Sequence, residues 1–348
     1  MTNKFSFRND YAEGCHANIL KALVETNREQ QAGYGDDMYS ALANKAIKER
    51  FNCPEASVYF VSGGTQANLL MISSMLRPHH SVISAESGHI FTNEAGAIEA
   101  TGHKVHAAAS TDGKLTIGSC QQVLDSVIIQ PHVVKPKMLY ISNSTELGTH
   151  YTLSELEALS RFCKEHKLYL FIDGARLGHA LSVENSDVTP EDIARLADAF
   201  YIGGTKNGAL IGEAIVIVNP ELQDDFAFQV KQKGALLAKG RLLGIQFMEL
   251  MKDDLYFDLA GSANQKAMRI KKAFEAGGCS FMTESFTNQI FPILPVAWIE
   301  KLAEAFDFFV WKKIDDEHAA IRLITSWATP EAEVDSFIAL LKTINIKK

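Results

Sequence analysis

Short apolar runs alternate with longer segments of helical periodicity through the first 220 residues of the chain. Several of the short runs are continuously apolar, as expected for strands that are buried on both faces of a sheet. The predicted strands lie at residues 57–61, 81–85, 105–109, 138–142, 168–172, 199–203 and 213–218. Helical patterns lie between many of them, for example at residues 66–76, 153–166 and 191–197. This alternation predicts an α/β fold with a mainly parallel seven-stranded sheet covered by helices on both faces.

The pattern changes after the last of these strands. A long helical stretch with breaks covers about residues 221–276 and leads to further strands and a final helix. The strand candidates lie at residues 281–285, 289–295, 306–313 and 320–327, and the helix at residues 330–344. This order predicts a small α+β C-terminal domain. We expect an N-terminal segment that contributes to the site, a large domain and a small domain, at residues 1–13, 14–250 and 251–348.

Composition narrows the class of protein. Hydrophobic residues make up 47% and charged residues 22% of the 348 residues, as in an ordinary globular protein. The net charge of −8 argues against nucleic acid or an anionic membrane surface as a partner. The five cysteines are scattered without a CxxC pair, and the first residues lack the apolar segment of a secretion signal. We therefore expect reduced thiols, a cytoplasmic location and no membrane span.

Three segments at the ends of predicted strands carry the candidate chemistry. The first is VSGGTQANLL, residues 61–70, which predicts a strand, a glycine turn and the start of a helix. Glycines let the backbone approach an anion, and the free N–H groups of a helix N-terminus favour negative charge. Thr65 adds a hydroxyl donor, so the segment suits a phosphate group. Taken alone, the segment is more commonly an ordinary turn in which Thr65 caps the helix.

The other two segments place a carboxylate and an amine at strand ends. Asp173 ends the apolar run LYLFID, where it needs a cationic partner; a helix cap paired with Arg176 is the structural alternative. Lys206 follows Gly203-Gly204-Thr205 at the end of the next predicted strand. Loss of hydration lowers the pKa of a lysine, which makes its amine available for attack on a carbonyl. Together, a phosphate turn, a carboxylate and an amine match the phosphate, pyridinium nitrogen and aldehyde of pyridoxal 5'-phosphate (PLP).

The motifs resemble those of the threonine aldolase and β-eliminating lyase family of fold-type-I PLP-dependent enzymes, closest to the low-specificity L-threonine aldolases. The similar stretches are YGDDMY (34–39), SGGTQAN (62–68), ESGHIFTNEAGA (86–97), FIDGARL (171–177), GGTKNG (203–208) and IRLITSW (321–327). The resemblance implies a fold-type-I PLP-transferase-like large domain. It also implies cleavage of a β-hydroxy-α-amino acid, of the L-threonine or L-allo-threonine type, to glycine and an aldehyde. The alternatives are a PLP-dependent β-eliminating lyase, a racemase, an aminotransferase or a non-enzymatic protein of the same fold.

The resemblance gives the motif residues their roles. Lys206 resembles the lysine that forms a Schiff base with the cofactor aldehyde. Asp173 resembles the partner of the pyridine nitrogen, which keeps that nitrogen protonated. Gly64 and Thr65 resemble the phosphate-binding turn, to which Thr205 adds a contact.

A histidine and two arginines complete the implied site. His89 stands where the family has a catalytic imidazole stacked on the cofactor ring. Arg176 resembles the arginine beside the cofactor's phenolic oxygen and the substrate carboxylate. Arg322 resembles the small-domain arginine that binds the same carboxylate, a task suited to a guanidinium. Asn9 occupies the place of a serine that contacts this carboxylate in many members.

One stretch departs from the family pattern. Many members have Glu-Asn-Thr-His where this chain has Asn143-Ser144-Thr145-Glu146, so Thr145 or Glu146 replaces a histidine near the substrate hydroxyl. His150 is expected in a surface loop. The base that acts on the hydroxyl is left open between Lys206, a water molecule and Glu146.

The phosphate of PLP is a dianion, and the resemblance implies a further cation from a neighbouring subunit. KQKGALLAKGRLLG, residues 231–244, offers Lys239 or Arg241 for this role, of which we favour Lys239. We therefore expect a homodimer, or a homotetramer of such dimers, with the cofactor at the dimer interface. No metal site is predicted, because His79-His80 has no third ligand at metal spacing.

Overall fold

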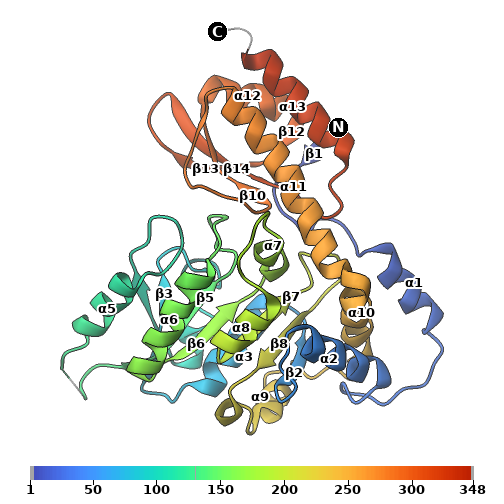
Figure 1. Cartoon of the computed structure of the whole chain (residues 1–348), viewed down its shortest axis with the longest axis vertical. Coiled ribbons are helices and arrows are strands. Elements are labelled where there is room, and N and C mark those ends of the chain that lie inside the picture. The colour runs from blue at the N-terminus through green and yellow to red at the C-terminus, as the bar shows by residue number, and fades with distance from the viewer. Residues whose placement is uncertain (1–3, 130, 346–348) are drawn as a thin grey trace.

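The computed structural model describes residues 4–129 and 131–345, so the outermost residues of the predicted end segments, 1–3 and 346–348, lie outside it. A seven-stranded sheet forms the centre of the larger part (Figure 1). In spatial order its strands are β2 (Ser57–Val61), β8 (Glu213–Ile217), β7 (Ala199–Gly203), β6 (Tyr169–Asp173), β5 (Lys135–Ser142), β3 (His80–Ala85) and β4 (Lys104–Ala108). In this sheet β8 runs antiparallel to both of its neighbours, and the other pairs are parallel. The predicted mainly parallel seven-stranded sheet is confirmed.

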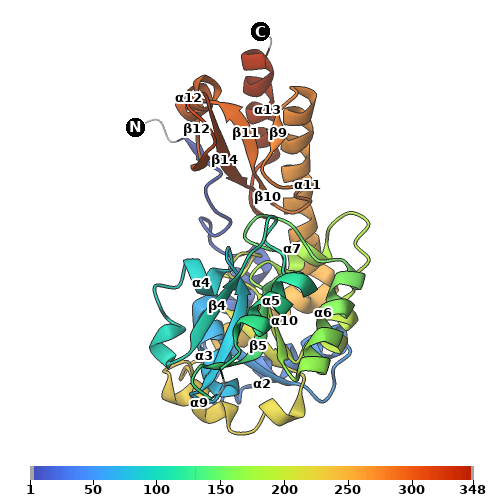
Figure 2. The ribbon, with the colours of Figure 1, turned by 90° about the vertical axis from the view of Figure 1, so that its left-hand side faces the viewer.

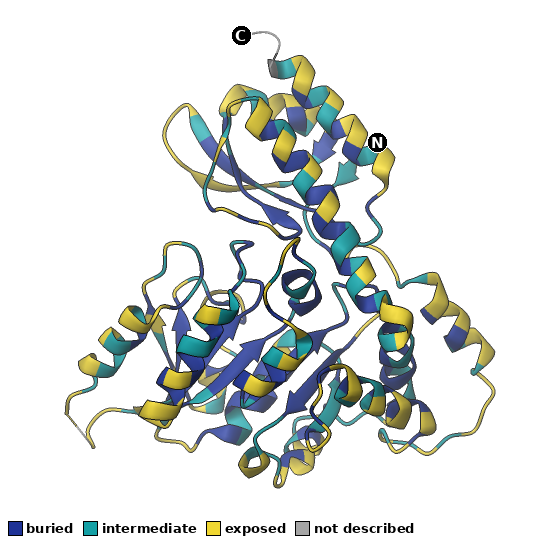
Figure 3. Cartoon of the chain, in the orientation of Figure 1, coloured by how far each residue is buried: buried dark blue, intermediate teal, exposed yellow. Residues whose placement is uncertain are grey.

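Both faces of this sheet are apolar because helices cover both. On β6, Leu170 and Ile172 belong to one hydrophobic cluster, whereas Phe171 between them belongs to the other. Helices α2 (Met38–Arg50), α5 (Ile117–Ser126), α6 (Leu153–His166), α8 (Pro190–Leu196) and α10 (Arg241–Met251) contribute to the first cluster. Helices α3 (Gly64–Met75) and α9 (Phe226–Gln232) contribute to the second. Figure 3 shows the buried strands between these layers, which explains why the strand sequences are continuously apolar.

Short helices connect these elements. They are α1 (Ala17–Glu25), which packs on α10, and α4 (His89–Thr92), α7 (Leu177–Leu181), η1 (Glu99–Thr101), η2 (Pro220–Leu222) and η3 (Lys252–Asp254). The helix α4 follows β3, and α7 follows β6, so both lie at the carboxyl ends of parallel strands. This edge of the sheet faces the smaller part of the molecule (Figure 1).

The smaller part contains a second sheet, as predicted. Its order is β10 (Gln289–Ile290), β14 (His318–Ile324), β11 (Pro292–Pro295) and β9 (Ser280–Phe281), with β13 (Phe309–Lys313) also paired to β14. All of these pairs are antiparallel. Three helices accompany the sheet: α11 (Leu255–Ala276), α12 (Val296–Ala305) and α13 (Glu331–Asn345). Because α11 packs against both α7 and α13, it joins the two parts, and the boundary at residue 250 stays a prediction.

The N-terminal segment packs with the small domain. Strand β1 (Phe5–Ser6) pairs in parallel with β12 (Phe306–Asp307), and the buried Phe7 side chain lies in the hydrophobic cluster of the small domain. Figure 2 shows this segment descending from the small domain toward the edge of the large sheet. The N-terminal segment therefore approaches the carboxyl edge of the large sheet from the side of the small domain.

Several strand predictions are wrong in extent: residues 306–313 form two strands, β12 and β13, and of residues 320–327 only those up to Ile324 lie in β14. Residues 281–285 were expected to form a strand, but only Ser280–Phe281 pair, and the chain then becomes irregular. Thr283 and Ser285 donate hydrogen bonds of 2.8 Å to the backbone oxygens of Leu147 and Gly148 in the large domain. Contacts between the domains thus replace strand pairing here. Across the described residues, every helix is too short or too polar to cross a membrane.

Candidate active site

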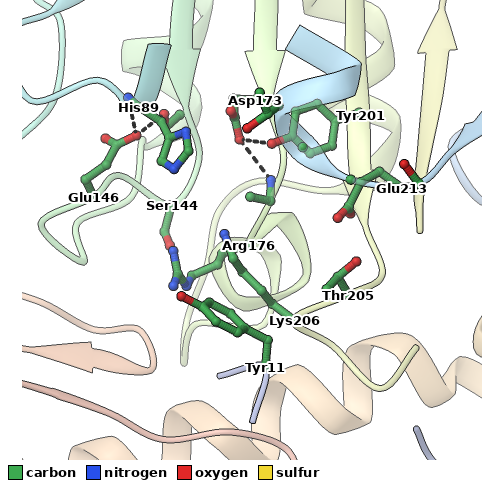
Figure 4. A pocket seen from close by; sticks show the side chains of 16 residues that line it. Tyr11, His89, Ser144, Glu146, Asp173, Arg176, Tyr201, Thr205, Lys206 and Glu213 are labelled. Atoms are coloured by element: carbon green, nitrogen blue, oxygen red, sulfur yellow. Dashed lines mark hydrogen bonds between the residues drawn. The ribbon is translucent and has the colours of Figure 1, made fainter. Parts of the chain in front are cut away.

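A cavity of about 300 Å³ lies at the carboxyl ends of the parallel strands (Figure 4). Seven of the residues predicted from the sequence line it: Gly64, Thr65, His89, Asp173, Arg176, Thr205 and Lys206. Asp173 is the last residue of β6, and the others come from segments that follow β2, β3, β6 and β7. The position agrees with the rule that open α/β sheets bind ligands beyond the carboxyl ends of their strands.

The glycine turn forms the N-terminus of α3. Gly63 is the N-cap, and no side chain caps the helix there. The Thr65 side chain is therefore not the cap that the structural alternative required. A Cβ atom on Gly64 would lie 2.9 Å from the Tyr201 hydroxyl, so a larger residue would crowd this wall of the cavity. The uncapped N–H groups of a 12-residue helix, with a hydroxyl beside them, suit an anion.

Asp173 is buried and accepts four hydrogen bonds. Both tyrosine hydroxyls, of Tyr140 and Tyr201, donate to its carboxylate at 2.5 Å. The amide of Asn68 and the backbone N–H of Ala175 donate at 3.0 Å. Hydrogen bonds of this kind stabilise the charge of a carboxylate and hold it in one orientation. A fixed negative charge thus faces the cavity.

The Lys206 side chain forms no hydrogen bond or ion pair with any residue in the described ranges. Burial lowers its pKa, and the nearby positive charge of Arg176 lowers it further. Both effects favour the neutral amine, which is the nucleophilic form. Thr205, next to it, accepts a 3.0 Å hydrogen bond from the backbone N–H of Gly212.

His89 is held at both its backbone and its ring. Its backbone N–H donates to Glu146 at 2.9 Å, and its Nδ1 lies 2.8 Å from the buried Glu94 carboxylate. Burial alone would lower the pKa of His89, but the hydrogen bond to Glu94 and the charge of Asp173 raise it. Burial raises the pKa of Glu146.

Arg176 and Arg322 differ in how they reach the cavity. Arg176 lines it and pairs with Asp10. Arg322 does not line it; its guanidinium lies over the rings of Phe309 and Trp311, at 5.1 and 4.6 Å. Burial and the neighbouring Arg176 lower the pKa of Arg322 to about 10. The two guanidiniums are therefore close enough for their charges to interact.

Three other predicted residues lie outside this cavity. Asn9 accepts a 3.1 Å hydrogen bond from the backbone of Tyr11, which does line the cavity. Lys239 is exposed, and the Arg241 guanidinium donates to the backbone oxygens of Glu29 and of Thr26. One subunit alone therefore does not bring either cation to the predicted phosphate site.

Of Thr145, Glu146 and His150, only Glu146 lines the cavity, as does Lys206, the other residue considered as the base. The Thr145 hydroxyl bonds to Thr149 inside the loop, at 2.7 Å. His150 lies in a loop and is partly buried, with its ring centroid 5.9 Å from that of Phe286.

Comparison with known proteins identifies the family. The sequence profile of a family described as beta-eliminating lyase matches residues 7–296. The chain belongs to this family. A low specificity L-threonine aldolase of Pseudomonas aeruginosa is 34% identical over 330 residues, which cover 93% of each chain.

Solved structures agree with the beta-eliminating lyase assignment. A threonine aldolase of Leishmania major is 48% identical, with a TM-score of 0.96 over 98% of this chain and 99% of that one. An aspartate aminotransferase of Thermus thermophilus, 15% identical, shares the fold, with a TM-score of 0.70 over 98% of this chain and 91% of that one. The predicted fold-type-I class is confirmed.

Sequence reasoning missed several residues of this beta-eliminating lyase site. Tyr11 and Tyr201 line the cavity. Asp10 and Glu94 lie outside it and form hydrogen bonds with Arg176 and His89, respectively. Glu213 also lines it, accepts a 2.8 Å hydrogen bond from the backbone of Gly204, and has a pKa raised to about 7 by burial. A usable signal existed for Glu213, because it is the single charge at the start of the apolar strand EAIVI.

Proposed function

We propose that this protein is a PLP-dependent carbon–carbon lyase that cleaves a β-hydroxy-α-amino acid, of the L-threonine or L-allo-threonine type, to glycine and an aldehyde. One observation carries the proposal: an unpaired amine, a fixed carboxylate and an uncapped helix N-terminus meet in one cavity. The similarity to chains named threonine aldolase supports the choice of reaction.

The residues present fit PLP by their chemistry. Lys206 offers a free amine for the aldehyde, and Asp173 offers a charge for the pyridinium nitrogen. Gly64 and Thr65 offer donors for the phosphate at the start of α3. His89 stands on the cavity wall where a ring could stack on it.

When bound, PLP supplies an aldehyde that joins the substrate amine and a ring that withdraws electrons from the α-carbon. The chain supplies the environment for that chemistry. Lys206, whose pKa burial lowers, can release and accept a proton near neutral pH more readily than an exposed lysine. The fixed charge of Asp173 would favour a proton on the pyridine nitrogen of the bound cofactor.

Orientation of the substrate selects the bond that breaks. Arg176 and Arg322 together would bind the substrate carboxylate, and this anchor fixes which bond at the α-carbon faces the withdrawing ring. We propose this role for the pair because Arg322 forms no ion pair among the described residues and lies near enough to Arg176 for the two charges to interact. Asn9 would add a donor from the N-terminal segment.

The test is a product analysis with purified protein and added PLP. Threonine, allo-threonine and other β-hydroxy amino acids should release glycine and the matching aldehyde. Serine and cysteine report on the main alternative, because β-elimination would release a keto acid and no glycine. Keto acid without glycine, an altered stereocentre alone, or amino-group transfer would each contradict the aldolase assignment.

We also propose a homodimer or a tetramer of dimers in the cytoplasm. The dimer follows from the missing cation, because the exposed Lys239 lies outside the cavity of its own chain. A reducing compartment is supported by the spacing of the five cysteines, which are scattered along the sequence without a CxxC pair.

A further inference from the structure

Glu94 is a buried acid whose position the proposed reaction does not by itself explain. It follows α4, and its side chain is fully buried. One oxygen, Oε1, receives both of its contacts: His89 Nδ1 at 2.8 Å and Asn68 Nδ2 at 2.7 Å. The other oxygen has no partner among the described residues. Burying a carboxylate with so few hydrogen-bond donors costs free energy of folding, so the presence of Glu94 at this position calls for an explanation.

The contact with His89 fixes which ring nitrogen carries a proton. A carboxylate can only accept, so the hydrogen between Glu94 Oε1 and His89 Nδ1 belongs to the imidazole. This holds for the neutral and the charged ring. Any proton that His89 exchanges with the cavity therefore passes through Nε2.

The contact with Asn68 extends the arrangement to the other side of the cavity. Asn68 is fully buried in α3, and its amide nitrogen donates to Asp173 Oδ2 at 3.0 Å as well as to Glu94. Its two hydrogens thus join two carboxylates that lie 79 positions apart, Glu94 and Asp173. The same helix begins at the glycine turn. One rigid element connects the predicted phosphate, pyridine and ring-stacking contacts.

We propose that Glu94 is a positioning residue, which fixes the Nδ1–H tautomer of His89 and, through the Asn68 amide, holds the His89 ring in register with Asp173. The inference rests on the proposed function only in taking the cavity as a PLP site. Glu94 itself does not line the cavity. Its effect on the cofactor therefore passes through His89 and Asp173.

The tautomer is measured directly by nitrogen-15 NMR of histidine-labelled protein, with His89→Asn to assign the signal. The wild type should show a protonated Nδ1 across the titration. In Glu94→Gln the midpoint of the His89 titration should fall by about one pH unit, because a neutral amide replaces the charge. Asp173, Glu146 and Lys206 also act on the ring, but they are the same in both proteins. Glu99→Gln, at an exposed carboxyl five residues on, is the control and should leave the midpoint unchanged.

The bridge is tested by a double-mutant cycle on PLP affinity. Glu94→Gln and Asn68→Leu should each weaken PLP binding by about 3- to 10-fold, and the double variant should lose less than the product of the two. Urea unfolding of each variant separates loss of fold from loss of positioning.

Three results would overturn the inference: a wild-type His89 protonated on Nε2 alone, coincident titrations of the wild type and Glu94→Gln, or effects on PLP affinity that multiply. None of these measurements requires turnover. A protein that binds PLP as expected but cleaves no β-hydroxy amino acid would contradict the proposed function and leave these results readable.

Discussion

Asp10 and Arg176 form a bidentate ion pair at the base of the site. The guanidinium donates from Nε at 2.7 Å and from Nη2 at 3.0 Å, and the Asp10 side chain is fully buried. Asn288, from the small domain, donates to the same carboxylate at 2.9 Å. Although burial alone would raise the pKa of Asp10, the Arg176 charge holds it well below its usual range. The N-terminal segment, the large domain and the small domain meet at this carboxylate.

Replacing Asp10 with Asn should weaken both fold and site. Loss of one partner of a buried pair leaves the Arg176 charge uncompensated, so we expect the free energy of unfolding to fall by about 3 kcal/mol. Affinity for glycine, whose carboxylate would meet the misplaced guanidinium, should fall about 10-fold or more. Urea titration and the absorption change of the bound cofactor on adding glycine measure the two effects.

Asp307→Asn is the matched control, because its pair with Arg8 is half-exposed at 3.7 Å and should contribute less than about 1 kcal/mol. If Asp10→Asn and Asp307→Asn behaved alike, the buried pair would have no special role.

Replacing Lys206 with Ala should remove the covalent bond to PLP. Borohydride should then fix no cofactor to the chain, and turnover should fall by about 10³-fold or more. Mass spectrometry after reduction reports the first effect, and Lys164→Ala, on the exposed face of α6, is the control. Some non-covalent binding should persist because the glycine turn is intact. A reduced adduct at full yield in Lys206→Ala would refute the assignment.

Replacing Asp173 with Asn should separate binding of PLP from use of PLP. The lysine adduct should still form, but turnover should fall by about 10²-fold or more, because a neutral amide does not hold a proton on the pyridine nitrogen. Tyr140 and Tyr201 donate to different carboxylate oxygens, so only one of them can still donate to the amide oxygen, and urea unfolding measures how far the fold is weakened. Near-normal turnover would remove Asp173 from this role.

Much of this site could be predicted from the sequence, because its charged residues stand at or just after the ends of apolar strands. Asp173 ends an apolar strand and Lys206 lies three residues after the end of another, and parallel strands end at one edge of a sheet, so their proximity follows from the pattern. Lys206 is also the one lysine of a glycine-rich stretch.

The residues behind the cavity could not be predicted in the same way. Asp10 meets Arg176 across 166 positions and Asn288 across 278, and no periodicity encodes such contacts. In the sequence, Tyr201 is an ordinary residue of an apolar strand, and only the structure shows that its hydroxyl donates to Asp173. The sequence signals faces and ends of elements, whereas these pairings depend on how the elements pack.

His179 should make stability depend on pH. It is fully buried, and neither ring nitrogen has a hydrogen-bond partner among residues 4–129 and 131–345. Burial lowers its pKa to about 4, from 6.5. Between these values the unfolded chain binds the proton and the folded chain does not, so stability rises with pH across this window and is lost as pH falls.

The shift of 6.5 to about 4 corresponds to an upper bound of about 3 kcal/mol. We expect the free energy of unfolding, measured with urea, to fall from pH 7.5 to pH 5 by more in the wild type than in His179→Asn, because asparagine does not titrate. Parallel curves for the two proteins would show that His179 is not buried in its neutral form.

The two-subunit site can be tested by complementation. Lys206→Ala and Lys239→Ala should each be poorly active alone, but hybrid dimers should contain one intact site. Co-expression should then recover about a quarter of wild-type activity, because half of random dimers are hybrids with one good site.

Lys239 is the better choice for this test, because Arg241 is already bound to backbone oxygens of its own chain. Exposed apolar side chains on α1 and α2, Leu20, Val24, Met38 and Leu42, offer a surface for such a dimer. No recovery in the hybrids, with both parents inactive, would place Lys239 outside a shared site.

The pairing of β1 with β12 sets a limit on the order in which the molecule can be assembled. Ser6 and Asp307 lie 301 positions apart, yet they are neighbours in the finished protein. During synthesis, the first strand leaves the ribosome long before its partner exists, while the strands of the large sheet between them can already pair. The Phe5 and Phe7 side chains therefore stay without their core until translation is nearly complete, and Asp10 stays without Asn288 for the same interval. A chain that stops short of β12 would carry a complete phosphate turn and lysine and still lack a closed site.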